Sequence, residues 1–178
     1  MKSLKRQVIC VGEYSTTPST GRKITIATWT IRFPKWLGKP LDEKQKGSYK
    51  IKPLVQIDEE PLFGELAILR LLQKNGWDGV WVDTYHNKFW KGLPDRTAPC
   101  SLPEKPKEVY DKIVARHGKY GGFFDIFAWH GQKFLFAEYK GEGDKLKPNQ
   151  ISWIAAAVSS GISPSSLLLI EYNVREAG

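Results

Sequence analysis

Residues 123–140 read FFDIFAWHGQKFLFAEYK. Aromatic and aliphatic residues fill both halves of this stretch, and His130-Gly131-Gln132 between them has the composition of a tight turn. The pattern predicts two strands joined as a β-hairpin. Because the strands of a hairpin run side by side in opposite directions, we expect Asp125, near the start of the first strand, to lie beside Glu138, near the end of the second.

The polar residues of this hairpin are expected to form one patch. Successive side chains of a strand point to opposite faces, so Glu138 and Lys140 point the same way and Tyr139 the other. With Asp125, this places two carboxylates at one end of a sheet, where burying like charges is costly unless a divalent cation compensates them. Oxygen ligands alone favour Mg²⁺ or Mn²⁺ over zinc.

Further elements are predicted on both sides of the hairpin. Apolar runs predict strands at residues 7–11, 23–33, 80–85 and 167–170. Helical spacing predicts helices over residues 61–75, 109–118 and 148–161. Glu65 then lies in the first turn of the first helix, and Gln150 in the first turn of the last. The expected fold class is α/β, with a mixed sheet of about four strands flanked by helices.

Each candidate residue also has a purely structural interpretation. Glu138 and Lys140 could form a solvated ion pair on an edge strand, worth about 0–1 kcal/mol. Asp125 could be a turn residue that precedes an apolar strand. Gln150 could serve as a capping partner at its helix N-terminus, and Glu65 could be favoured there by the helix dipole alone.

Positive charge is concentrated in the first third of the chain. Residues 1–56 hold 12 Lys and Arg against 3 Asp and Glu, whereas the remaining residues hold 15 against 16. A basic segment beside a near-neutral body fits a polyanion-binding surface, although a solvated basic face explains the charge equally well. We divide the chain into a basic, β-rich N-terminal extension at residues 1–57 and a core at residues 58–178, with an insertion at 86–118.

Composition excludes several other classes of protein. The 178 residues, 41% hydrophobic and 26% charged, are typical of one folded globular domain. No run approaches the ~18 apolar residues of a membrane span, and no signal peptide is predicted, so we expect no membrane partner and a cytoplasmic location. Cys10 and Cys100 lie far apart and the three histidines are scattered, which argues against a zinc site and for free thiols.

The order of these features resembles a known nuclease superfamily. An Asp, a hairpin with Glu-x-Lys, a loop, Pro-Asn-Gln and a helix follow one another as in the PD-(D/E)XK nucleases, and more narrowly as in their VRR-NUC branch. The residues that carry the resemblance are Gly121-Gly122-Phe123-Phe124-Asp125, Glu138-Tyr139-Lys140-Gly141, Asp144 and Pro148-Asn149-Gln150-Ile151-Ser152-Trp153. Each motif alone is weak, but chance does not readily supply the ordered combination.

The resemblance implies a restriction-endonuclease-like core that hydrolyses phosphodiester bonds. Asp125, Glu138 and the backbone carbonyl of Tyr139 would hold Mg²⁺ or Mn²⁺. Lys140 would orient the attacking water or balance charge on the phosphorus. The implied substrate is nucleic acid, DNA more than RNA, including branched forms handled in replication and repair.

Two further residues receive roles from the same resemblance. Gln150 would position Lys140 or contact a phosphate. Glu65, at the place of the helix acid found in many members, would bind a second ion or its hydration shell. Homo-oligomers are compatible with the sequence, which does not specify the oligomeric state.

The chain departs from the family pattern before the hairpin. Phe124 precedes Asp125 where the family usually has proline, whereas a literal Pro94-Asp95 pair occurs earlier. No strand follows that pair, and it lies too far from Glu138 to be its hairpin partner. We therefore prefer Asp125 as the metal ligand and interpret Asp95 as a loop residue.

Two functions from other classes remain open from the sequence. The first is a nucleic-acid-binding module that keeps the fold but does not cleave, and that would bind DNA without metal. The second is a protein-interaction subunit, for which the basic extension and the aromatic-rich residues 77–90 could supply a surface. A cleavage assay with Mg²⁺, Mn²⁺ or EDTA distinguishes these functions from a nuclease.

Overall fold

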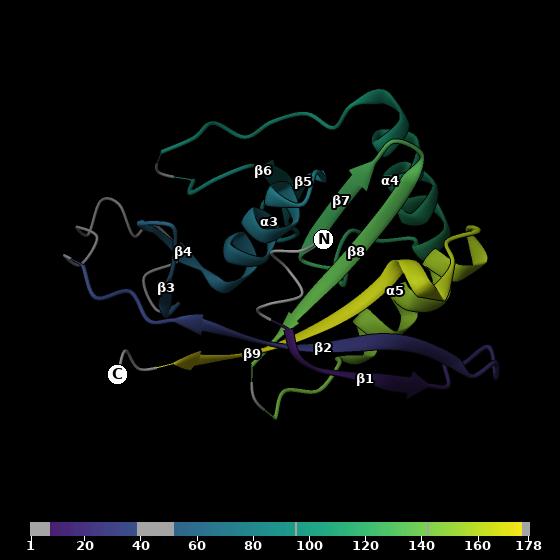
Figure 1. The fold of residues 1–178 in the computed structure, drawn as a ribbon. Coiled ribbons are helices and arrows are strands. Elements are labelled where there is room, and N and C mark those ends of the chain that lie inside the picture. The colour runs from purple at the N-terminus through teal and green to yellow at the C-terminus, as the bar shows by residue number, and fades with distance from the viewer. Residues whose placement is uncertain (1–7, 39–51, 95, 142, 176–178) are drawn as a thin grey trace.

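A mixed seven-stranded β-sheet forms the centre of the computed structural model, which describes residues 8–38, 52–94, 96–141 and 143–175. Its strand order is β1-β2-β9-β8-β7-β5-β6 (Figure 1). The strands are β1 (Val8–Thr16), β2 (Ile24–Pro34), β5 (Asp78–Asp83), β6 (Lys88–Trp90), β7 (Ile126–His130), β8 (Lys133–Lys140) and β9 (Leu167–Arg175). β9 runs parallel to both of its neighbours, β2 and β8, and the other pairs are antiparallel.

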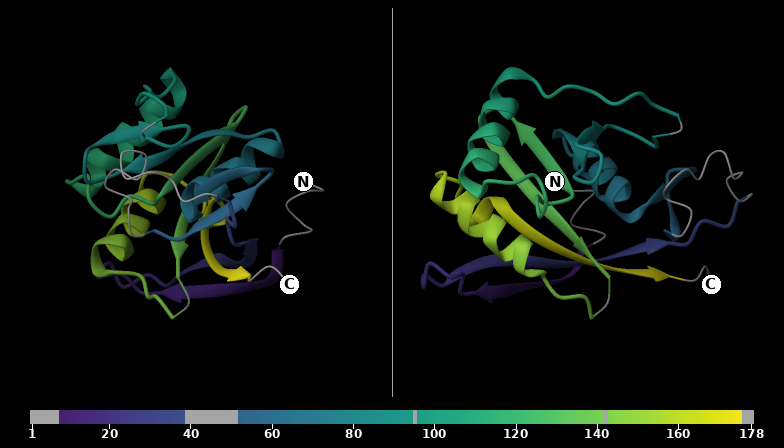
Figure 2. Two further views of the ribbon diagram at one scale, coloured as in Figure 1. Left: turned by 90° about the vertical axis from the view of Figure 1, so that its left-hand side faces the viewer. Right: turned by 180° about the vertical axis from the view of Figure 1, so that it is seen from behind.

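In the described parts of the chain, three α-helices cover the two faces of this sheet. Helix α3 (Gly64–Lys74) packs on one face, and α4 (Glu104–His117) and α5 (Pro148–Ser159) lie together on the other (Figure 2). A short 3₁₀ helix, η2 (Pro164–Ser166), precedes β9. The α/β class with a mixed sheet flanked by helices is confirmed, and the arrangement is consistent with a restriction-endonuclease-like fold.

The hairpin predicted from residues 123–140 forms from β7 and β8. Ile126 pairs with Ala137, and the turn contains Gly131 with a φ of 59°. Alternation along β8 sends Ala137 to the core under α3 and Phe136 to the core under α5. By the same alternation, Glu138 and Lys140 project toward the α5 side of the sheet, and Tyr139 toward the α3 side.

The sheet is larger than the four or so strands expected from the sequence. β1 pairs with β2, and β2 pairs in parallel with β9 over Ala27 to Pro34. The basic N-terminal extension therefore contributes two strands to the sheet that carries the hairpin. The predicted insertion at 86–118 contains β6 and α4, and the boundary at residues 57 and 58 stays a prediction.

The predicted start of the first helix at Pro61 is wrong. Residues 60–63 instead form β4 (Glu60–Phe63), which pairs with β3 (Leu54–Ile57), and α3 begins at Gly64. The reason is a two-residue turn, Asp58 and Glu59, whose φ values of 50° and 57° match the primed turns that join antiparallel strands. Pairing across this turn satisfies the backbone groups that a longer helix would have used.

Two features of the described residues concern membrane spans and cysteines. No helix within the described ranges is long and apolar enough to cross a bilayer. Cys10 is exposed and Cys100 is partly buried, and both thiols are free.

Trp153 anchors α5 to the sheet. Its side chain is fully buried, with the ring stacked at 4.5 Å on Phe124 and in edge contact with Phe136 at 5.5 Å. It is therefore a core residue and not a platform for a nucleobase. The start of α5 depends on this contact for its place beside β8.

We predict that Trp153→Ala lowers the free energy of unfolding by about 3–5 kcal/mol, because it removes a fully buried ring from a packed aromatic cluster. Chemical denaturation measures the change. Tyr85→Ala is the control, since that ring is 90% exposed and its loss should cost at most about 0.5 kcal/mol. Equal losses in the two variants would contradict the assignment of Trp153 to the core.

Candidate active site

The polar residues predicted from the sequence gather where β7 begins and β8 ends. Asp125 lies one residue before β7, and its backbone carbonyl accepts a hydrogen bond from the Val82 N–H of β5 at 2.7 Å. The neighbouring β8 carries Glu138 and Lys140 as its last polar residues. The N-terminus of α5 supplies Gln150 to the same cluster.

Asp125 and Glu138 are linked through the backbone of the hairpin. The Asp125 N–H donates to Oε2 of Glu138 at 3.3 Å, and the Tyr139 N–H donates to Oδ2 of Asp125 at 3.0 Å. These crossed bonds hold the two carboxylates at the same end of the sheet. The structure thus brings the pair together as the hairpin predicted, while a role in metal binding stays a prediction.

Lys140, Gln150 and Glu138 form a closed hydrogen-bonded group. The Lys140 ammonium donates to Oε1 of Gln150 at 2.9 Å and lies 3.2 Å from Oε1 of Glu138. The Gln150 amide nitrogen donates in turn to Oε1 of Glu138. Because β8 is an interior strand and Glu138 and Lys140 are only 3% and 8% exposed, their interpretation as a solvated ion pair on an edge strand is wrong.

Gln150 combines its capping role with these contacts. Its Oε1 also accepts from the Lys147 N–H at 2.9 Å, which satisfies a free donor at the start of α5. One amide oxygen therefore fixes the helix start and the Lys140 ammonium together. The residue joins the end of β8 to the start of α5.

Glu65 is buried in the first turn of α3 and faces a second lysine. Its Oε1 accepts a hydrogen bond from the Lys52 ammonium, whereas its Oε2 is buried with no hydrogen-bond partner in the described part of the chain. No motif marks Lys52 in the sequence. Its only signal is position, since it lies in a basic region 13 residues before Glu65.

Two residues outside the cluster complete the comparison with the sequence. Asp144 acts within its loop, where its Oδ2 accepts from the Gly141 N–H at 3.2 Å and its own N–H donates back to the Gly141 carbonyl at 3.1 Å. Asp95, the alternative to Asp125, lies outside the described residues.

Comparison with known families agrees with this geometry. The VRR-NUC domain profile matches residues 67–165, more than half of the chain. The chain belongs to the VRR-NUC family. This confirms the resemblance seen in the sequence, and a VRR-NUC domain implies a nuclease-type function with nucleic acid as substrate. No curated protein and no solved structure matched the chain.

The VRR-NUC match covers only some of the residues around the site. It contains Asp125, Glu138, Lys140 and Gln150, and it begins two residues after Glu65. Lys52 and the strands β1 to β4 lie before it. Contacts made by these earlier residues are therefore features of this chain beyond the matched domain.

Both carboxylates of this VRR-NUC site are buried, and the positive charge nearby is too small to stabilise their ionised forms fully. Burial raises the pKa of Asp125 well above its ordinary value, and the nearby Glu138 and Glu65 carboxylates raise it further. Burial likewise raises the pKa of Glu138 to about 7, against the opposing effect of the Lys140 ammonium. A proton or a cation at this site would relieve the repulsion.

The available donors fit a hard divalent cation. In the ranges that the structure describes, no three His, Cys, Asp or Glu side chains converge closely enough to hold a metal ion, so Asp125 and Glu138 would hold an ion as a pair. Mg²⁺ suits such a pair, because it keeps several waters and commonly binds through one or two carboxylates. The N–H and C=O of a strand residue point to the same side, so the Tyr139 carbonyl is directed toward the side of Asp125.

The raised pKa of Glu138 predicts that stability without divalent cation falls as pH rises. Folding favours the protonated side chain, so this stabilisation is fully present below about 4.5, its ordinary pKa, and is lost as pH rises through about 7. Thermal unfolding in EDTA at a series of pH values between these limits measures the decline. Glu138→Gln should show a smaller decline over the same window, and equal declines would show that Glu138 does not titrate in it.

Proposed function

We propose that this VRR-NUC domain is a metal-dependent nuclease that hydrolyses phosphodiester bonds in DNA, with Mg²⁺ or Mn²⁺ as its ion. The observation that supports this most directly is the burial of Glu138 and Lys140 beside Asp125, inside the sheet. Burying three charged groups is costly, and a surface ion pair would not require it. A function explains this energetic cost of burial if the cluster binds a cation and promotes the attack of water on a phosphate.

Each residue of the cluster has a separate role in the proposed reaction. Asp125 and Glu138 would hold the ion, which when bound polarises the phosphate and lowers the pKa of a coordinated water. Lys140 provides a compact ammonium, fixed by Gln150, to balance charge on the pentacoordinate phosphorus or to orient the water. The amide oxygen of Gln150 accepts from Lys140 and its amide nitrogen donates to Glu138. Because both ends of the amide are engaged, these contacts favour a positioning role for Gln150 over a phosphate contact.

Lys140→Ala should lower the turnover number by about 100-fold or more while the Kd for DNA changes little, because the lost charge acts mainly in the transition state. Cleavage of labelled linear, single-stranded and branched DNA with Mg²⁺ or Mn²⁺ gives the rates. Lys133→Ala is the matched control, since it removes a lysine from the exposed start of the same strand. Cleavage that survives Lys140→Ala in a folded protein would contradict the mechanism.

The non-catalytic binding module is the second candidate. The same assay tests it, because wild-type protein that binds DNA in EDTA and cleaves no form with either metal would favour this module. Asp125→Asn should abolish metal-dependent cleavage if the nuclease proposal holds, while DNA binding persists or improves as repulsion between carboxylate and phosphate is removed.

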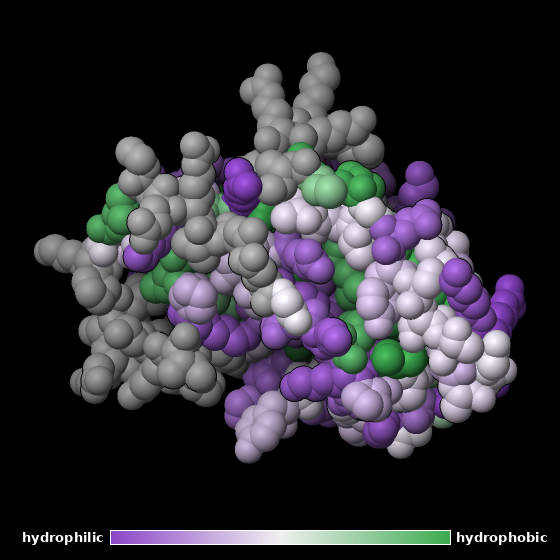
Figure 3. All heavy atoms as spheres, turned by 90° about the horizontal axis from the view of Figure 1, so that it is seen from below, coloured by the Kyte–Doolittle hydropathy of each residue, from purple (hydrophilic) through white to green (hydrophobic). Residues whose placement is uncertain are grey.

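Arg32 is a described basic residue of the N-terminal extension whose position suits contact with DNA. Lys140, Glu171 and Thr30 are register partners across β8, β9 and β2, so their side chains share one face of the sheet. Arg32 lies two residues beyond Thr30 on that face, exposed and with no ion pair among the described residues. Seen from below, hydrophilic residues gather in the middle of the molecular surface (Figure 3).

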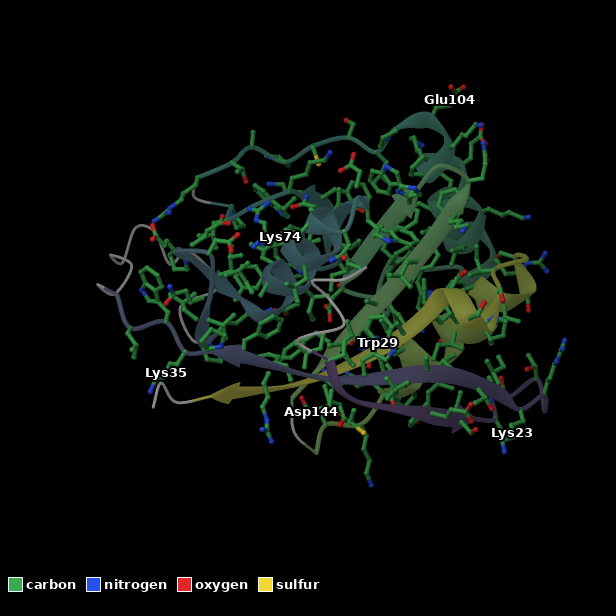
Figure 4. The ribbon with its side chains drawn as sticks, in the orientation of Figure 1. Lys23, Trp29, Lys35, Lys74, Glu104 and Asp144 are labelled. Carbon is green, nitrogen blue, oxygen red and sulfur yellow. The ribbon has the colours of Figure 1, made fainter. Side chains whose placement is uncertain are left out.

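Arg32→Ala should weaken DNA binding and reduce the slope of log K against log salt by about one, because one phosphate contact is lost. Arg22→Ala is the matched control, because Arg22 is exposed and lies two residues before the other end of β2, at most about 33 Å away for ten extended residues. Figure 4 shows these opposite ends, marked by Lys23 and Lys35. Equal slopes for the two variants would place the DNA elsewhere.

A further inference from the structure

Lys52 occupies a defined position beside the candidate metal site. Its ammonium donates to Oε1 of Glu65 and lies 5.0 Å from the ring centroid of Phe63 and 5.8 Å from that of Trp81. Aromatic faces attract a cation, so the two rings and the carboxylate together hold the ammonium in place. The Lys52 side chain is about one-third exposed, whereas the Glu65 side chain is 5% exposed.

The Lys52–Glu65 pair is electrostatically part of the same cluster as Asp125. The Glu65 carboxylate raises the pKa of both Asp125 and Glu138, and the Lys52 ammonium lowers the pKa of Asp125. Two lysines therefore flank the carboxylates: Lys140 beside Glu138, and Lys52 beside Glu65. Each buried acid at the edge of the cluster has its own cationic partner.

This arrangement bears on how many metal ions the cluster can hold. Glu65 does not join Asp125 and Glu138 in a three-carboxylate site within the described residues. A second ion would need Glu65 as a ligand, and the Lys52 ammonium already contacts that carboxylate. Two cations at one carboxylate oxygen repel each other, so the ammonium opposes the second ion.

We propose that Lys52 is a resident cation that takes the place of a second metal ion at Glu65, so that the cluster binds one divalent cation per chain. This rests on the proposed metal-dependent function. Of the two roles expected for Glu65, the ligand of a second ion is then excluded by Lys52. The buried Oε2, which has no partner in the described part of the chain, is left to accept a hydrogen bond from the hydration shell of the single ion.

The number of Mn²⁺ ions bound per chain tests this inference without measuring cleavage. Free Mn²⁺ is followed by its electron paramagnetic resonance signal during titration of the whole chain. A double variant, Asp125→Asn with Glu65→Gln, lacks one carboxylate of the Asp125–Glu138 pair and the carboxylate that contacts Lys52. The number of ions bound by the cluster is the number bound by the protein under test minus the number bound by this double variant. The wild-type protein should bind one ion there, and Lys52→Met should bind two.

Two controls separate the charge of Lys52 from general effects. Lys52→Arg keeps the charge and should still bind one ion. Lys74→Met makes the same change at the last residue of α3 (Figure 4). Lys74 is similarly exposed and pairs with Asp58. It lies about 14 Å along the helix from Glu65 and should also bind one ion. Circular dichroism verifies that each variant is folded.

Each count has a distinct meaning. Two cluster ions in the wild-type protein would overturn the inference without any variant, and so would a folded Lys52→Met protein that binds one. No cluster ion in the wild-type protein would contradict the proposed metal-dependent function itself. One ion in the wild-type protein and two in Lys52→Met would establish Lys52 as the substitute for a second metal ion.

Discussion

Repulsion between the buried carboxylates of Asp125 and Glu138 is the constraint on which the site depends. Two like charges inside a sheet are stable only where protons, cations or hydrogen-bond donors offset them. The surrounding elements supply such donors: the Tyr139 N–H of β8, the Lys140 ammonium and the Gln150 amide of α5. The negative charge that these donors do not compensate favours the binding of a divalent cation.

Packing behind the cluster fixes the elements that provide those donors. Trp153 holds α5 against the aromatic residues that precede and follow Asp125 in the hairpin. Gly122 allows the incoming chain to pass close to α5, because its φ is 90° and a Cβ there would lie 2.6 Å from the Asn149 carbonyl oxygen. A side chain at this point would push Asp125 and the start of α5 apart, and with them the metal ligands and Gln150.

Local patterns made the hairpin and its polar residues predictable, whereas long-range pairing did not. Alternation along residues 133–140 placed Glu138 and Lys140 on one face, and a Gly-containing turn placed Asp125 opposite them. The parallel pairing of β2 with β9 joins segments more than 130 residues apart, and no short-range signal specifies it. Lys52 was missed for a similar reason, since its contact with Glu65 depends on the β3–β4 hairpin and its positive-φ turn.

The account rests most heavily on the claim that Asp125 and Glu138 share one divalent cation. Anomalous X-ray scattering from a crystal soaked in Mn²⁺ tests it directly, because it locates the ion itself. The expected result is one peak between the two carboxylates, about 2.0–2.2 Å from an oxygen of each and within reach of the Tyr139 carbonyl. A crystal in which Mn²⁺ binds only elsewhere, with both carboxylates unligated, would contradict the account.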